Sequence, residues 1–288
     1  MSRRVAVVTG ANRGIGLAVV RNLCKKFNGD VILTSRMTPK GKDALRVLQK
    51  EGLNPVFHEL DITQSESIWM LRKYIEDHYG GIDILINNAA VSFDKGEKVP
   101  IFRKAQLCFE IDFFGTLNVN KLFLPLLRPH ARVVIMTNGY IGLHSALNGD
   151  AKSRFNVDSL RLYDLEVLAN EYLKAVKYGT YQKFGWPESP SQCAKILLVE
   201  MASILSKTLE NDQRRNLLVN ACCPGWTRSD GSREYVNDDG NSVGDVALQD
   251  PDTAAADVVW LATLPPGTAT ICGNLVRHRN TIKTATCT

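Results

Sequence analysis

Short apolar runs alternate with amphipathic segments along the whole chain, and this alternation predicts an α/β fold. The apolar runs are continuously hydrophobic instead of alternating with polar residues, as in strands buried on both faces. A glycine-rich loop follows the first run and leads directly into a helical segment. Together these observations predict a doubly wound parallel sheet of about seven strands with helices on both faces.

Each expected element has a local signal. The expected strands are the apolar, β-branched runs at 4–10, 30–35, 54–62, 82–90, 131–138, 216–225 and 271–276. The expected helices show helical periodicity and lie at 14–27, 40–52, 65–81, 104–127 and 192–209. A Ser/Glu cap opens the helix at 65–81 and two glycines close it.

Two polar segments interrupt this rhythm. Residues 144–186 form an insertion before the last long helix and are partly helical in pattern. Residues 228–250 are acidic and glycine-rich, as expected of a substrate-side loop. Since each segment follows a strand, we expect both to line the crevice at the carboxyl ends of the strands. We expect residues 1–288 to form a single domain.

Composition excludes several classes of protein. The 288 residues are 44% hydrophobic and 23% charged, with a net charge of only +5, so a nucleic-acid partner is not expected. The seven cysteines have no CxxC spacing and the five histidines are scattered, so we expect reduced thiols, a cytoplasmic location and no metal site. Neither a signal peptide nor a run of about 20 apolar residues is found, so no membrane association is expected.

The loop from Thr9 to Gly16 has the pattern of a dinucleotide-binding turn. Gly10, Gly14 and Gly16 let the backbone turn sharply and approach a ligand closely. The helix that follows presents free N–H groups and a positive dipole end to a phosphate. This placement predicts a fold of the Rossmann type, although the glycines could also serve a purely structural turn.

The end of the second expected strand indicates which dinucleotide binds. NAD enzymes place an acid there to hold the ribose hydroxyls. This chain has Ser35 followed by Arg36, and Arg13 lies in the glycine loop. Two guanidinium groups without a carboxylate favour a 2′-phosphate and therefore NADP(H). A solvated surface role for Arg36 is the alternative.

Several further motifs lie at independent places in the chain: LDI at 60–62, INNAA at 86–90, DFFGT at 112–116 and NACCPGW at 220–226. With the glycine loop, they resemble the short-chain dehydrogenase/reductase family, and LATLPPG near the end resembles its monomeric carbonyl reductase branch. The resemblance implies hydride transfer between NADPH and a ketone, aldehyde or quinone. It also implies a monomer, because the insertion resembles the segment that, in the monomeric branch, covers the surface through which other members dimerise.

The resemblance also implies site residues. Asp61 would contact the adenine, Asn87 would border the ribose, and Trp226 and Tyr140 would line the substrate pocket. The full expected cofactor set is Gly10, Asn12, Arg13, Gly14, Ile15, Gly16, Arg36, Asp61, Ile62, Asn87, Ala89, Lys195, Pro224, Gly225, Trp226 and Thr227.

The family performs catalysis with an asparagine, a serine, a tyrosine and a lysine four residues after the tyrosine. The corresponding positions here are Asp112, Asn138, Ser191 and Lys195, so only the lysine matches. None of the eight tyrosines has a lysine four residues later, so the phenol is not present in another register.

The replacements differ in their expected consequences. Asn138 can still donate a hydrogen bond to a carbonyl oxygen, and an ionised Asp112 could pair with Lys195. The alcohol of Ser191 is a far weaker acid than a phenol, and loss of a positioned general acid typically lowers rates by about 10²–10⁴-fold. Tyr140, water or a residue of the insertion could supply the proton instead. We therefore expect a weakly active carbonyl reductase or, alternatively, an inactive NADP(H)-binding protein that acts as a sensor, scaffold or regulator.

Overall fold

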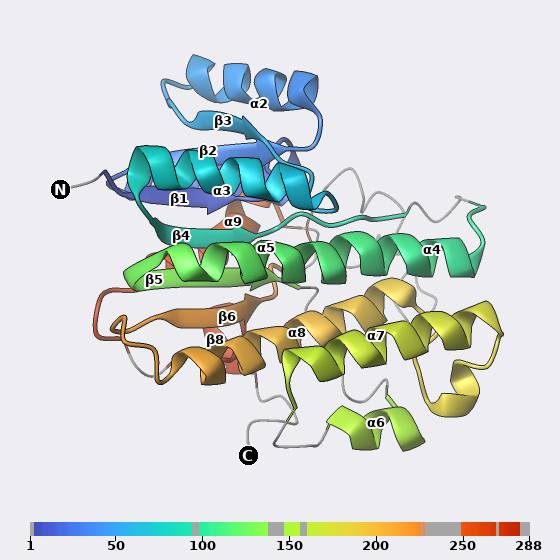
Figure 1. Ribbon diagram of the computed structural model, residues 1–288. Coiled ribbons are helices and arrows are strands. Elements are labelled where there is room, and N and C mark those ends of the chain that lie inside the picture. The colour runs from blue at the N-terminus through green and yellow to red at the C-terminus, as the bar shows by residue number, and fades with distance from the viewer. Residues whose placement is uncertain are drawn as a thin grey trace.

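A computed structural model describes residues 3–93, 98–137, 147–155, 160–225, 227, 249–268 and 271–282. At its centre lies an eight-stranded sheet with the order β3-β2-β1-β4-β5-β6-β7-β8 (Figure 1). The strands are β1 (Val5–Val8), β2 (Asp30–Ser35), β3 (Val56–Glu59), β4 (Ile82–Asn87), β5 (Leu127–Met136), β6 (Leu218–Cys222), β7 (Leu275–Arg277) and β8 (Asn280–Ile282).

The first seven strands are parallel, which confirms the predicted doubly wound sheet. The eighth strand was not predicted: β8 returns antiparallel to β7 after a two-residue turn. Its three residues, NTI, are too short and polar to give a strand signal. Strand order reverses between β1 and β4, and ligands bind at such a switch point in open α/β sheets.

Helices cover both faces of the sheet, and each face has its own apolar core. One face carries α3 (Ser65–Tyr79), α4 (Ile101–Cys108), α5 (Thr116–Phe123), α7 (Leu162–Lys177) and α8 (Pro190–Leu209). The other carries α1 (Gly14–Lys26), α2 (Thr38–Lys50) and α9 (Pro251–Ala262). Helix α9 was not predicted from the sequence, although Asp250 caps it by accepting a hydrogen bond from the Asp252 N–H at 2.8 Å.

The predicted long helix at 104–127 differs from the structure at its end and in its middle. A seven-residue π-helical turn, η1 (Phe109–Gly115), separates α4 from α5. The helix ends at Phe123, because Pro125 lacks an N–H and cannot continue the hydrogen-bond ladder. Single-turn π segments often occur at functional sites.

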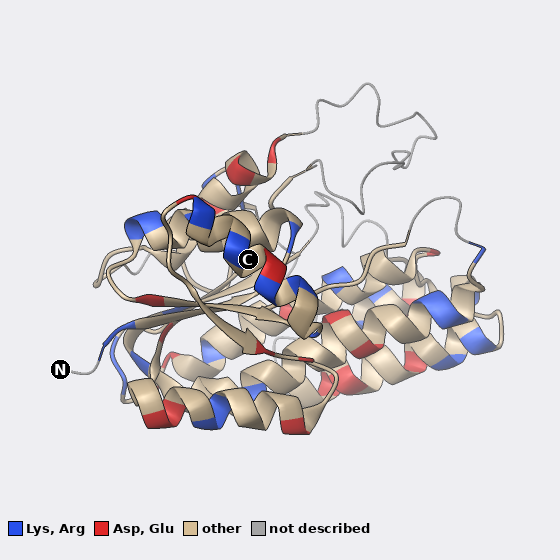
Figure 2. Ribbon diagram, turned by 90° about the horizontal axis from the view of Figure 1, so that it is seen from above, with Lys and Arg blue, Asp and Glu red and all other residues tan. Residues whose placement is uncertain are grey.

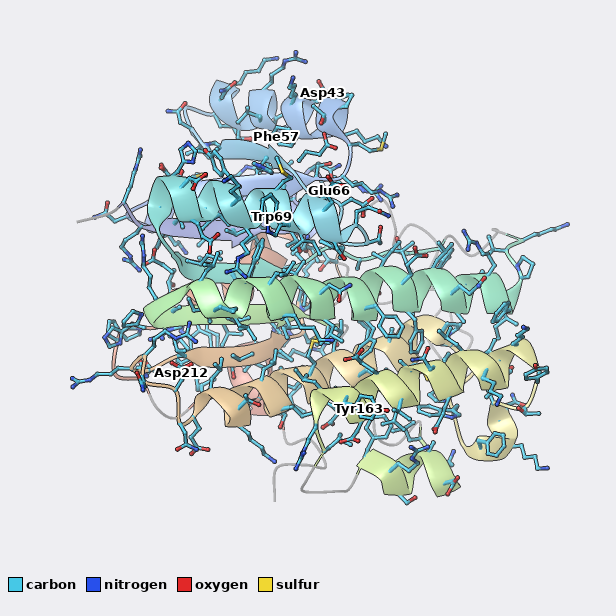
Figure 3. All side chains as sticks on the ribbon, viewed as in Figure 1. Asp43, Phe57, Glu66, Trp69, Tyr163 and Asp212 are labelled. Atoms are coloured by element: carbon cyan, nitrogen blue, oxygen red, sulfur yellow. The ribbon has the colours of Figure 1, made fainter. Side chains whose placement is uncertain are left out.

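Part of the 144–186 segment forms α6 (Gly149–Phe155) and α7. The inner face of α7 packs against α4 and α8, where the Tyr172 ring stacks on Phe109 with centroids 5.1 Å apart. Basic and acidic residues are intermixed on the helices visible in Figure 2. Tyr163 at the start of α7 and Trp69 of α3 project outward (Figure 3), and Tyr163 is 73% exposed. No helix in the described ranges is long and apolar enough to cross a membrane.

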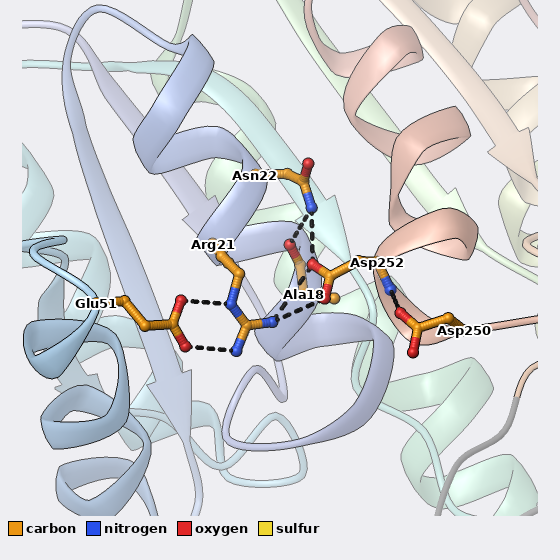
Figure 4. Close-up of polar contacts among 6 residues, drawn as sticks. All are labelled: Ala18, Arg21, Asn22, Glu51, Asp250 and Asp252. Atoms are coloured by element: carbon orange, nitrogen blue, oxygen red, sulfur yellow. Dashed lines mark hydrogen bonds and ion pairs between the residues drawn. The ribbon is translucent and has the colours of Figure 1, made fainter.

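A polar network fixes α1 against its neighbours (Figure 4). The Arg21 guanidinium donates two hydrogen bonds to Glu51 just after α2, at 2.7 and 2.9 Å. It also donates to Asp252 in the first turn of α9, at 3.2 Å to the nearer oxygen. Arg21 lowers the pKa of the Glu51 carboxyl. The helix that begins at the glycine loop is therefore tied to α2 and α9.

We expect Arg21→Met to reduce the free energy of unfolding at neutral pH by about 1–2 kcal/mol, because a multi-partner, partly shielded guanidinium contributes more than an isolated surface pair. The pKa of Glu51 is lowered by folding, so its contribution is present above the unfolded pKa and lost as pH falls through the folded pKa. Urea denaturation at pH 7 and pH ~3 should therefore show that Arg21→Met lowers the free energy of unfolding less at the acid pH.

Arg46→Met is the matched control, since the one ion pair of Arg46 with a described residue is with Asp43, and its side chain is 70% exposed. If Arg21→Met lowers the free energy of unfolding no more than Arg46→Met does, the network is not stabilising.

Candidate functional site

A cavity of about 430 Å³ lies at the carboxyl ends of the central strands, where the sequence analysis places the ligand. It extends from the end of β2 and β3 across β1 and β4 to β5 and α8. The predicted cofactor residues that line it are Gly10, Asn12, Arg13, Gly14, Ile15, Gly16, Arg36, Asp61, Ile62, Ala89, Lys195 and Pro224.

The glycine loop lies against the end of β4 because two of its residues have no side chain. Gly10 has φ +62°, and a Cβ there would lie 2.7 Å from the Ala89 Cα. A Cβ on Gly16 would lie 2.4 Å from Asn88 Nδ2. Helix α1 begins at Gly14 with no side-chain cap and no acid in its first turn. Its first N–H groups therefore provide an anion-binding end at the wall of the cavity.

Asn88 holds the loop in place, although Asn87 and not Asn88 was expected at the site from the sequence. The Asn88 amide donates to the carbonyl oxygens of Thr9 and Gly10, at 2.9 and 3.0 Å. Thr9 Oγ1 accepts from the N–H groups of Asn88 and Ala89, at 2.9 and 3.0 Å.

Asn87, expected to border the ribose, is buried and absent from the cavity lining; its amide donates to Asn120 Oδ1 at 3.3 Å. Asn87 is the last residue of β4 and Asn88 follows the strand, so adjacent asparagines have different surroundings. The alternation of side chains along a strand was the signal that could have separated them.

The end of the cavity nearest β2 is basic. Arg36 lines it, and so does Lys40 in the first turn of α2, a residue that was not singled out from the sequence. Both side chains are exposed, and neither forms an ion pair with another described residue. Strand β2 ends at Ser35 and not at a carboxylate. Ser35 Oγ accepts a hydrogen bond from the Met37 N–H at 3.2 Å.

Asp61 also lines this end. Its Oδ1 accepts hydrogen bonds from the Thr63 N–H at 2.9 Å and from Thr63 Oγ1 at 2.7 Å. This local turn fixes the carboxylate at the mouth of the cavity next to Ile62. The arrangement suits an adenosine moiety that carries a phosphate near Arg36 and Lys40.

The far end of the cavity contains a buried ion pair. Lys195 Nζ lies 3.1 Å from Asp112 Oδ2, with side-chain exposures of 6% and 0%. Asp112 Oδ1 accepts a hydrogen bond from the Val91 N–H at 2.8 Å. Burial raises the pKa of the Asp112 carboxyl, while Lys195 and the Val91 N–H act against that increase. The π-helical turn η1 brings Asp112 to this position.

Ser191 and Lys195 lie four residues apart on α8, as predicted, and so occupy one face of that helix. Ser191 is half-buried and absent from the lining of the cavity, and its hydroxyl has no hydrogen-bond partner in the described ranges. Ser189 caps the helix by accepting from the Gln192 N–H at 3.3 Å. Thr137 at the end of β5 lines the cavity, and its hydroxyl donates to the Lys195 carbonyl at 3.4 Å.

Three predicted residues, Asn138, Tyr140 and Trp226, lie outside the described residues. Gly225 and Thr227, expected to bind cofactor, are not in the cavity lining; the Thr227 hydroxyl donates to the Gly225 carbonyl at 3.2 Å. No group of His, Cys, Asp and Glu among the described residues could hold a metal ion.

Comparison with known proteins gives concordant results. A family model described as short chain dehydrogenase matches residues 4–148. The chain is 37% identical to "Carbonyl reductase [NADPH] 1" of Rattus norvegicus over 96% of this chain and 97% of the relative. It is 38% identical to "Carbonyl reductase [NADPH] 3" of the same species, over 96% of each chain.

Solved structures support the same fold. Salutaridine reductase from Papaver somniferum matches with a TM-score of 0.81 at 24% identity, covering 95% of this chain and 99% of that one. Menthone neomenthol reductase from Mentha piperita matches with a TM-score of 0.77 at 26% identity, covering 96% and 98%.

Proposed function

The chain belongs to the short-chain dehydrogenase family, and we propose that it binds NADP(H) in the 430 Å³ cavity and reduces a small ketone, aldehyde or quinone only slowly. The observation that carries the proposal is the cavity itself. It presents exposed cations at one end, a helix N-terminus in the middle and a buried lysine at the other. The relatives named for NADPH-dependent carbonyl reduction support this assignment.

The described residues fit such a cofactor. Arg36 and Lys40 would hold the 2′-phosphate, the first turn of α1 the pyrophosphate, and Lys195 the nicotinamide ribose. The bound cofactor supplies the hydride. The protein must orient it and deliver a proton to the carbonyl oxygen.

We expect Lys40→Met and Arg36→Met each to weaken NADPH binding by roughly 5–30-fold, because each removes a charge-assisted contact to a phosphate. NADH affinity should change less than twofold, since NADH has no 2′-phosphate. Titration by NADPH and NADH fluorescence measures both.

Lys42→Met provides the control, because Lys42 is exposed on the same helix but absent from the cavity lining. A parent protein that binds NADH as tightly as NADPH would contradict the proposed specificity.

Proton delivery is the weak step of the proposed reaction. By the family resemblance, Ser191 on α8 stands where a tyrosine would protonate the carbonyl oxygen, and an aliphatic alcohol is too weak an acid. The charge of Lys195 is also offset by Asp112 at 3.1 Å, so it would lower a neighbouring phenol's pKa less than an unpaired ammonium. This pairing favours a second candidate function, that of an NADP(H)-binding protein with no turnover.

We expect Ser191→Tyr combined with Asn138→Ser to raise NADPH-dependent reduction of a dione or quinone by about 10–100-fold, because a positioned acid is restored. Adding Asp112→Asn should increase the gain, because the Lys195 charge then acts on the new phenol. NADPH oxidation measured at 340 nm distinguishes the variants.

Wild-type activity at the background rate, together with rescue, would favour the non-catalytic candidate. Fast wild-type turnover that survives Lys195→Met would contradict the assignment of this site. Wild-type turnover lost in Tyr140→Phe would instead identify a different proton donor.

The proposal includes a cytoplasmic monomer that acts on a small molecule without a nucleic-acid or membrane partner. Support for the monomer comes from α7, whose buried residues cover α4 and α8, the helices through which other family members are expected to pair. Light scattering should give a mass near 31.9 kDa at micromolar concentration. A stable dimer would contradict this part of the proposal.

A further inference from the structure

We infer that Asp112 determines which redox form of the cofactor the site prefers, by neutralising Lys195 and so favouring the oxidised, positively charged nicotinamide. This inference rests on the proposed NADP(H) site and adds a role for a residue that does not line the cavity. Asp112 is thus a positioning and charge-compensating residue that acts through Lys195.

The contacts of Asp112 hold its side chain beside the Lys195 ammonium. Its two oxygens are used separately, one 3.1 Å from Lys195 Nζ and the other accepting the Val91 N–H at 2.8 Å. Asp112 is fully buried and Lys195 is only 6% exposed, so solvent and salt screen the pair weakly. Of the described residues that line the cavity, only Asp61 is acidic, and it lies at the opposite end beside Ile62.

The orientation of the dinucleotide follows from the charges of the cavity. Its phosphate-bearing adenosine half would lie by Arg36 and Lys40, beyond the ends of β2 and β3. The cofactor then crosses the N-terminus of α1, so its nicotinamide half lies by Thr137 and Lys195. Lys195, which Asp112 contacts from behind the lining, would therefore be the charged residue of the described lining nearest to the redox-active ring.

The two redox forms differ by one charge on that ring. Oxidised nicotinamide carries a positive charge and the reduced ring is neutral. A lone Lys195 ammonium would disfavour the oxidised form, whereas the Asp112 carboxylate offsets that repulsion. The asparagine that the family resemblance predicts at this position would leave the ammonium uncompensated. This chain should therefore retain NADP⁺ more strongly, relative to NADPH, than an otherwise identical site with an amide.

The test is calorimetric titration of NADP⁺ and NADPH into the full chain and into Asp112→Asn, without any substrate. We expect the variant to bind NADP⁺ about 3–10-fold more weakly while its NADPH affinity changes less than about twofold, the size expected for partly shielded charges near a protein interior. Asn has nearly the shape of Asp and can still accept from Val91, so the variant keeps the local packing.

Two further variants separate charge from structure. Asp83→Asn removes a largely shielded carboxylate, 12% exposed, that pairs with Arg128 at 2.9 Å at the opposite, amino end of β4, and it should leave the ratio of NADP⁺ to NADPH affinity unchanged. Lys195→Met combined with Asp112→Asn removes both charges. This double variant should return the ratio of NADP⁺ to NADPH affinity toward the wild-type value.

The outcomes are distinct. If Asp112→Asn leaves the ratio of NADP⁺ to NADPH affinity unchanged, or weakens the binding of both forms equally, the inference is overturned while the proposed function stays intact. Failure of the wild-type protein to bind either form would refute the proposed function itself.

Discussion

The close junction between the ends of β1 and β4 is the constraint on which the cavity depends. Thr9 Oγ1 accepts hydrogen bonds from the backbone N–H groups of Asn88 and Ala89, which follow β4. In return, the Asn88 side-chain amide donates hydrogen bonds to the carbonyl oxygens of Thr9 and Gly10. Ala89 then lies so near Gly10 that no Cβ can be placed between them. Because this junction fixes where α1 begins, it also fixes where an anion can bind.

The fold could be predicted from the sequence because each buried strand is a continuous apolar run and each run is followed by a helical pattern. The glycine loop and Arg36 could be singled out for the same reason: their expected roles follow from local position in a strand–loop–helix unit. β8 and α9 were missed since a three-residue polar strand and a largely apolar helix give no distinctive periodicity.

The site was less predictable where tertiary contacts decide the role. Lys40 lies on a helix whose pattern does not distinguish it from Lys42, and only the placement of α2 beside β2 brings one of them to the cavity. Asn87 and Asn88 are identical in type and adjacent, so the choice between them depends on where β4 ends. The pairing of Lys195 with Asp112 could be named as a possibility, but its distance depends on the π-helical turn, which the sequence does not signal.

The two ends of the cavity are built for different purposes. At the β2 end, exposed cations that form no ion pair with another described residue can bind a phosphate at little cost, since the fold does not desolvate them first. At the α8 end, an ion pair is held out of water, and such a pair seldom adds stability over apolar residues of similar volume. A costly buried pair next to the expected nicotinamide is therefore better explained by a requirement of the ligand than by one of the fold. Discrimination between NADPH and NADH would then be set at one end of the cavity and redox preference at the other, and each could change by mutation without altering the other.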